Sequence, residues 1–416
     1  TAADRSQMNH TPKLRPVEAL PVDMEGERVI CLRDNTGIAR NVVAISIQAF
    51  FVAAHFDGRR TVDEIRDAYR KRFNMELPEE QISGLISQLD NALMLESERF
   101  ESHRRQVCDA YRNATVRKPA HAGTAYPSEP DALRKFIDDF FELPDGPGMP
   151  VRGEGGDGVK AIAAPHIDMR RGGACYAHAY KELLERCPAR TFVILGTLHQ
   201  HADAPYIVTD KDFATPLGTV ECDRDFTNEL ADRAGLNFDE EIVHLNEHSI
   251  EFQAVVLKRF YGASRPVKIV PVLCGHLLQA VGNAPSPMDA PGVEGFLSAL
   301  RELIQERGEE TAVIASVDLS HVGRRFGHEL ALTDEVMKNV EQLDRALLKQ
   351  VEEGDANGFF EAHRRTGDRN HICGASALHA LLSVCDVRRG RLLKYGQAPE
   401  PATQSVVSFA AIAFEK

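Results

Sequence analysis

The chain has 416 residues, enough for two or three domains, and its 43% hydrophobic and 27% charged residues are typical of a globular protein. A formal net charge of −13 argues against sequence-independent nucleic-acid binding, because phosphate contacts need a concentrated cationic face. The first ten residues are polar, without an apolar signal core, and no apolar stretch is long enough to cross a bilayer. We therefore expect a soluble cytoplasmic protein.

The first hundred residues predict a small α+β domain. Alternating apolar residues indicate a strand pair, and three helical patterns follow it, at residues 43–55, 61–73 and 78–92. Thr61 and Glu64 form a capping-box pair at the second helix, and Pro78 suits the first turn of the third. This order of elements is typical of a winged-helix-like module.

Two stretches of this region carry a resemblance to a known family. The sequences D-G-R-R-T-V-D-E-I (57–65) and Q-I-S-G-L-I-S-Q-L-D-N-A-L-M-L (81–95) resemble PqqD-like winged-helix modules. The resemblance implies a domain that holds a peptide for a partner radical-SAM enzyme. A plain packing or docking domain is an equal alternative, whereas the nearly balanced charges, without a basic recognition helix, disfavour DNA binding. We assign residues 1–97 to this domain and the charged residues 98–118 to a linker.

From residue 119 to 416 the sequence predicts a second, α/β domain. Apolar strand patterns alternate with helical patterns, which is typical of a mixed, mostly parallel sheet flanked by helices. The strands are expected at 159–165, 191–197, 204–210, 268–273, 311–317 and 405–414. The helices are expected at about 130–143, 173–186, 224–234, 249–260, 292–306 and 328–350.

Three of these strands are followed by residues that can bind a metal or transfer a proton. His166 and Asp168 follow the strand at 159, His199 follows the strand at 191, and Asp318 and His321 follow the strand at 311. Ligands in open α/β sheets bind beyond the carboxyl ends of the strands. We therefore expect these side chains to face one cleft, although each of them alone would more often be a hydrogen-bonded structural residue.

Two helix starts add further candidates. His248 opens the helical pattern at 249–260, and Cys373 precedes Gly374 at the start of a small-residue helix. A thiol at a helix amino terminus is favoured as the thiolate, the form that binds metals. The other seven cysteines are scattered, with no C-x-x-C pair; they are expected to be reduced, and most of them to be core residues. Arg170 and Arg171 are read as a solvated helix start in preference to an anion site.

The candidate residues lie in segments that resemble one known family over nearly the whole second domain. The chain from His121 onward resembles the Memo family, in its long bacterial form known as AmmeMemoRadiSam system protein B. The matching segments, in order, are H-A-G-T-A-Y-P (121–127), A-P-H-I-D (164–168), I-L-G-T-L-H (194–199), T-P-L-G (215–218), E-H-S-I-E (247–251), P-V-L-C-G (271–275), D-L-S-H (318–321) and I-C-G (372–374).

The resemblance implies a fold similar to class III extradiol dioxygenases and a set of site residues. His166, His199 and Cys373 match the family's metal ligands, Asp318 a neighbouring pocket carboxylate, and His248 and His321 pocket histidines. Asp168 is a local departure that adds a carboxylate near the cleft. Cys373 in the third ligand position differs from the dioxygenases, which bind their metal through two histidines and one carboxylate.

The residue types leave the metal and its third ligand open. Two imidazoles and a thiolate suit iron(II), copper(I) or zinc, whereas two imidazoles and the Asp318 carboxylate would form a facial triad for iron(II). Iron(II) is our first expectation. His248 and His321, with reference pKa values near ~6.5, are either proton carriers or residues that orient the ligands.

Three functions remain open at this point. The first is a non-haem iron redox enzyme, or an enzyme subunit, acting with a radical-SAM enzyme and an AMMECR-type protein, partners that the family name implies. The second is a non-catalytic metal-binding or peptide-presenting scaffold. The third is a zinc hydrolase, in which a metal-bound water attacks an ester or amide.

Overall fold

The structure, a computed structural model, describes residues 11–24, 26–151, 158–262, 265–282, 284–387 and 389–415. The polar first ten residues considered above for targeting lie outside this range. The chain divides after Asn113 into an amino-terminal unit, residues 1–113, and a carboxyl-terminal unit, residues 114–416. Each unit has its own apolar core, so the two are described separately.

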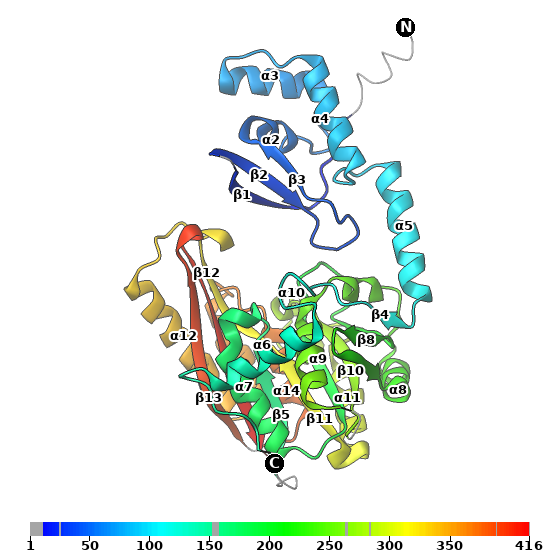
Figure 1. Ribbon diagram of the computed structural model, residues 1–416, viewed down its shortest axis with the longest axis vertical. Helices are drawn as coiled ribbons and strands as arrows, with labels where there is room; N and C mark the ends of the chain where they lie inside the picture. The colour runs from blue at the N-terminus through cyan, green and yellow to red at the C-terminus, as the bar shows by residue number, and fades with distance from the viewer. Residues whose placement is uncertain are drawn as a thin grey trace. The chain divides into compact units, whose positions relative to one another are not determined.

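The amino-terminal unit packs helices on a small antiparallel sheet with the strand order β1-β2-β3 (Figure 1). Leu32, Ile65 and Leu89 are fully buried in its core. The predicted capping box is present, because Thr61 accepts the Glu64 amide and Glu64 accepts the Thr61 amide. Its elements are β1 (Glu18–Met24), β2 (Glu27–Arg33), β3 (Val43–Ser46), α2 (Ile47–Ala53), α3 (Val62–Phe73), α4 (Glu79–Asn91) and α5 (Glu98–Asn113).

Two segments of this unit differ from the sequence-based description. The helix predicted at 43–55 starts as strand β3, in which Val43 and Ile45 point inward, and it becomes helical only after Ser46, whose hydroxyl caps α2. Within the predicted linker, residues 98–113 form helix α5, and the Arg15 guanidinium lies 3.6 Å from the centroid of the buried Phe100 ring.

The carboxyl-terminal unit is built on one large mixed sheet. Its strand order is β12-β14-β5-β11-β6-β10-β9-β8-β4, with β13 paired to β14 and β7 to β10. The central strands β5, β11, β6 and β10 are parallel. The strands are β4 (Val116–Arg117), β5 (Val159–Ala164), β6 (Thr191–Thr197), β7 (Tyr206–Val208), β8 (Asp212–Thr215), β9 (Gly218–Cys222), β10 (Lys268–Cys274), β11 (Thr311–Ser316), β12 (Asp318–Gly323), β13 (Arg389–Glu400) and β14 (Ser405–Glu415).

Helices cover both faces of this sheet, as Figure 1 shows. Side chains alternate along each strand, so that Ile162 of β5 packs under one helical layer and its neighbours Ala161 and Ala163 under the other. One layer contains α6 (Pro130–Glu142), α7 (Met169–Arg186) and α9 (His248–Phe260). The other contains α8 (Arg224–Ala234), α10 (Leu277–Val281), α11 (Val293–Arg307), α12 (Asp334–Glu352), α13 (Ala356–Thr366) and α14 (Ala375–Val384).

This architecture confirms the predicted α/β fold with a mixed, mostly parallel sheet between helices. The pairing register places Ala164, Gly196 and Ser316 side by side, so β5, β6 and β11 end together. The residues that follow these three strands are therefore delivered to a single edge of the sheet.

The boundaries of several other elements were not predicted. Helix α12 starts at Asp334 instead of residue 328, because Thr333 caps it by accepting the amide of Val336. Strand β13 was missed, since its polar sequence has no alternation and its place depends on a long pairing with β14. In the described part of the chain, every helix is too short or too polar to span a membrane.

Candidate metal site at the carboxyl edge of the sheet

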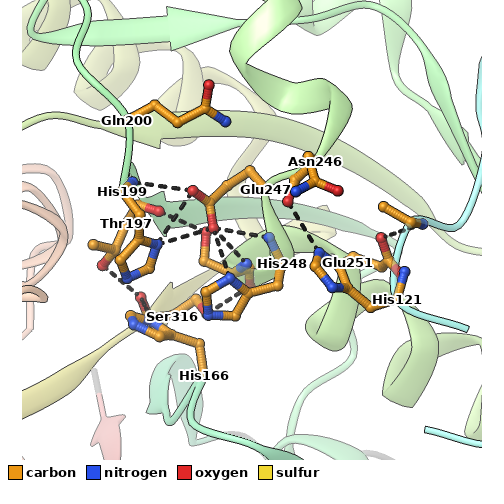
Figure 2. Close-up of polar contacts among 12 residues, drawn as sticks. His121, His166, Thr197, His199, Gln200, Asn246, Glu247, His248, Glu251 and Ser316 are labelled. Carbon is orange, nitrogen blue, oxygen red and sulfur yellow. Dashed lines mark hydrogen bonds and ion pairs between the residues drawn. The ribbon is translucent and has the colours of Figure 1, made fainter. Parts of the chain in front are cut away.

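Three histidine rings meet where the parallel strands end. His166 follows β5, His199 follows β6, and His248 is the first residue of α9. Their ring centroids lie 5.0 Å apart for His166 and His199, 5.4 Å for His166 and His248, and 4.7 Å for His199 and His248. One nitrogen from each ring lies within 4.8 Å of the others. Figure 2 shows the three rings together with Glu247.

His166 is held in one tautomer by the end of β11. Its Nδ1–H donates to the carbonyl of Ser316 at 2.9 Å, which leaves Nε2 as the nitrogen with a free lone pair. The ring is almost fully buried, and burial lowers the pKa of His166 to about 3. The imidazole is therefore neutral at physiological pH, as a metal ligand must be.

Glu247 holds the other two rings. Its carboxylate accepts Nδ1–H of His199 at 3.1 Å and the His199 backbone amide at 3.0 Å, and it lies 3.2 Å from Nδ1 of His248 (Figure 2). Glu247 also caps α9, accepting the amides of His248 and Ser249. Burial raises the pKa of Glu247, but these donors outweigh burial and lower it well below its ordinary value. The ionised carboxylate directs Nε2 of His199 away from itself, toward the cluster.

The two other histidine pKa values follow from the same contacts. Burial lowers the pKa of His248 well below its ordinary value, so that ring is neutral. Burial also acts to lower the pKa of His199, but the Glu247 carboxylate reverses this and raises it well above its ordinary value. Glu247 therefore favours a positive charge at Nε2 of His199, which a proton or a metal cation can provide.

Cys373 and Asp318 are the two other candidate ligands, and both lie beside His166. The Sγ of Cys373 is 3.3 Å from His166 Nε2, and Oδ2 of Asp318 is 3.7 Å from the same nitrogen. The other oxygen of Asp318 accepts the backbone amides of His166 and Ile167. Burial raises the pKa of Asp318 to about 6. Of the two, Cys373 lies closer to the histidine nitrogens.

One expectation about Cys373 is wrong. The position before a helix was expected to favour its thiolate, but burial raises the pKa of the Cys373 thiol above its ordinary value. The sulfur is also within hydrogen-bonding reach of His199, which acts in the opposite direction without outweighing burial. A cation at the histidine nitrogens would favour deprotonation of this thiol.

The remaining predicted site residues have local partners. Asp168 caps α7, because its carboxylate accepts the amide of Arg170. His321 lies in β12, its Nδ1 is 3.0 Å from the carbonyl of Leu319, and burial lowers its pKa. Arg170 and Arg171 donate to backbone carbonyls at Ala125 and Ala398, not to the histidine cluster.

Two residues of the site were not predicted. Glu247 directly precedes His248. Its position just before the predicted helix was the sequence signal that could have identified it as a capping carboxylate. His121 places its ring 5.7 Å from that of His248 and its Nε2 3.0 Å from the carbonyl of Asn246. The spacing of His121 from the other histidines in the sequence does not indicate that it lies beside His248. Its place depends on β4 and on the loop that follows this strand.

The donor set fits a transition metal. Two ligands of one ion, each bonded at ~2.1 Å, lie at most ~4.2 Å apart, so nitrogens within 4.8 Å need to close by only about half an ångström. The tautomers of His166 and His199 are already fixed with Nε2 directed to the centre. His248 was predicted as a proton carrier or as a residue that orients the ligands, and the geometry makes it a third nitrogen ligand candidate beside Cys373 and Asp318.

Comparison with known proteins matches the same part of the chain. A family model described as Memo-like protein matches residues 117–413. A MEMO1 family protein of Methanopyrus kandleri is 31% identical over 308 residues, 72% of this chain and 99% of that protein. A MEMO1 family protein of Aquifex aeolicus is 26% identical over 407 residues, 97% of this chain and 99% of its own length, and this match therefore takes in the amino-terminal unit.

Proposed function

The chain belongs to the Memo family, and from that premise we propose that it is a metal-dependent redox protein whose cation is bound by His166, His199 and Cys373. The observation that carries the proposal is the convergence of three imidazoles, two of them with tautomers fixed by Ser316 and Glu247, beside one sulfur. A mixed nitrogen and sulfur set suits iron(II), with copper and zinc as alternatives.

The bound ion would supply Lewis acidity and, for iron or copper, one-electron chemistry. The protein's own residues would do the rest. Asp318, whose Oδ2 lies 3.7 Å from Nε2 of His166, is the carboxylate placed to accept or release a proton beside the ion. Glu247 keeps His199 oriented, and His321 on β12 is a second proton carrier at the edge of the site.

Metal analysis after anaerobic purification is the direct test of this function. We expect about one equivalent of iron, or of copper, per chain. Stoichiometric zinc without redox activity would instead favour the hydrolase. Absence of any transition metal after reconstitution, with the fold intact, would contradict the metal-dependent function and leave the non-catalytic scaffold.

We further propose that the protein works in the cytoplasm with a radical-SAM enzyme and an AMMECR-type protein. All eight cysteines are free thiols, which supports a reducing compartment. In the amino-terminal unit, β1 is an edge strand with Val22 and Met24 exposed, which offers backbone groups and apolar side chains to an extended peptide.

Removal of residues 1–113 separates the two proposed activities. We expect the truncated protein to lose binding to the radical-SAM partner or its peptide, measured by calorimetric titration, while its metal content stays at the full-chain value. Equal partner binding before and after truncation would rule out the amino-terminal unit as the capture domain.

A further inference from the structure

A buried glutamine of α9 bonds to two of the strand ends that carry the candidate metal site. Gln253 is fully buried, and its Nε2 donates at 2.8 Å to the carbonyl of Pro165, the residue before His166. The same nitrogen donates at 2.8 Å to Oγ of Ser316, the last residue of β11. One side chain therefore links α9 to the ends of both β5 and β11.

The hydrogen-bond partners fix the orientation of this amide. The Pro165 carbonyl can only accept, and Oγ of Ser316 uses its own hydrogen to donate to the carbonyl of Ser249 at 2.6 Å. Both partners of the Gln253 nitrogen are thus acceptors, and Oε1 on the other side of the amide accepts the hydroxyl of Tyr180 at 2.8 Å. The position therefore requires a side chain with two donor hydrogens and an acceptor, which glutamine supplies.

The carbonyl of Ser316 continues this network to the metal site. It accepts Nδ1–H of His166 at 2.9 Å and the hydroxyl of Thr197, the last residue of β6, at 3.1 Å (Figure 2). Oγ of Ser249 in turn donates to the carbonyl of Thr197 at 2.8 Å. Buried side chains thus join the ends of β5, β6 and β11 to the first turn of α9.

The first turn of α9 also packs closely on β6. Gly196 of β6 has no side chain, and a Cβ there would lie 2.6 Å from Cγ1 of Ile250 and 2.7 Å from Oγ of Ser249, closer than van der Waals contact. This close approach fixes the distance between the helix and the sheet. The directional bonds of Gln253 fix the register of the helix relative to the strand ends.

We propose that Gln253 is a positioning residue for the candidate metal site. Its amide keeps the carbonyl of Ser316 in place to hold His166 in the Nδ1–H tautomer, and it keeps Glu247 and His248 at the start of α9 in register with that ring. The atoms of the amide are engaged in these bonds, so Gln253 acts through its neighbours. Its effect on metal affinity rests on the proposed function, whereas its effect on the His166 tautomer needs no metal.

Metal affinity is measured in Gln253→Met, which keeps the length of the side chain and removes its hydrogen bonds. Residues that orient metal ligands typically contribute about 10- to 100-fold, so we expect a loss of at least ~10-fold by competitive chelator titration. Leu303→Ala removes a fully buried side chain of α11 on the other face of the sheet. This control should lower stability but keep metal affinity within ~3-fold. Wild-type affinity in folded Gln253→Met would overturn the proposal.

An NMR measurement on the metal-free protein tests the tautomer directly. With ¹⁵N-labelled histidine, correlation spectra distinguish a ring protonated at Nδ1 from one protonated at Nε2, and the His166 signals are those missing in His166→Ala. We expect the Nδ1–H tautomer in the wild type and in Leu303→Ala, and a mixture of both tautomers in Gln253→Met. An unchanged tautomer in Gln253→Met would contradict the positioning role.

A smaller substitution keeps the test possible if Gln253→Met does not fold. Ser316→Ala removes one hydroxyl and breaks the link from Gln253 to Ser249, but it keeps the carbonyl that His166 bonds. We expect a loss of metal affinity of about 3- to 10-fold and a partial change of tautomer, and the absence of both would overturn the proposal. A wild-type protein that binds no metal, but whose Nδ1–H tautomer is disturbed in Ser316→Ala, would contradict the metal function and support the positioning role.

Discussion

Replacement of His166 with alanine is expected to lower the protein's metal affinity by more than ~100-fold. Loss of a residue that only orients a ligand typically costs about 10- to 100-fold, and loss of the ligand itself costs more. Nε2 of His166 lies 3.3 Å from Cys373 Sγ and 3.7 Å from Asp318 Oδ2, and His166 belongs to every candidate ligand set, so its loss disrupts all of them at once. The measurement is metal content and competitive chelator titration of folded protein.

Variants of the neighbouring residues should give a graded series. Glu247→Gln keeps the shape of the side chain but removes the charge that orients His199, and we expect an intermediate loss of about 10- to 100-fold. His178→Ala, far from the cluster on α7, is the control and should bind metal normally. A His166→Ala protein that retains stoichiometric, tightly bound metal would contradict the site.

The third ligand is identified by the same experiment with cobalt(II). If Cys373 is the ligand, the loaded protein absorbs through sulfur-to-metal charge transfer, and Cys373→Ser removes this band. His248→Gln should then leave the band in place. Loss of metal in His248→Gln together with normal metal binding in Cys373→Ser would instead assign the three-histidine set.

The fold was largely predictable because its central strands are buried on both faces. Continuous apolar runs such as Thr191–Thr197 and Lys268–Cys274 show this burial directly in the sequence. Strand β13 is different, because it is only half-buried and its polar sequence forms a strand through its pairing with β14. Pairing partners far away in the chain are not visible in a local pattern.

The site was predictable to the extent that it depends on strand ends. His166 and His199 converge because β5, β11 and β6 are parallel and in register, and a parallel sheet was predicted. The place of His248 depends on how α9 packs over β6, which no spacing in the sequence reveals. The same holds for Glu247, whose role depends on the direction in which α9 begins.

A buried ion pair connects this helix to the start of the carboxyl-terminal unit. Arg117 in β4 and Glu251 in α9 are both almost fully buried and form an ion pair. Arg117 also donates to the carbonyls of His244 and Glu247 at 2.9 and 2.8 Å, next to the residues that orient the metal ligands. Glu251 in turn accepts the amide of His121 and the hydroxyl of Tyr126.

We expect Glu251→Gln to destabilise the carboxyl-terminal unit by about 3–5 kcal/mol, because it leaves the Arg117 guanidinium buried without its anion. Arg134→Ala, which breaks an exposed pair with Asp131, is the control and should cost less than about 1 kcal/mol. The free energy of unfolding is measured by urea titration. Burial alone would raise the pKa of Glu251, but Arg117 lowers it, so the wild-type pair should persist into the acid range.

The double variant Arg117→Met with Glu251→Leu tests whether the stability lost in Glu251→Gln comes from the unpaired buried charge. If the cost comes from the unpaired buried charge, replacing both partners with apolar residues restores much of the stability that Glu251→Gln loses. Glu247 and His248 stand at the start of α9. If Glu251→Gln shifts this end of the helix, metal affinity should therefore fall together with the free energy of unfolding. A Glu251→Gln protein as stable as the Arg134→Ala control would show that the pair does not hold α9 in place.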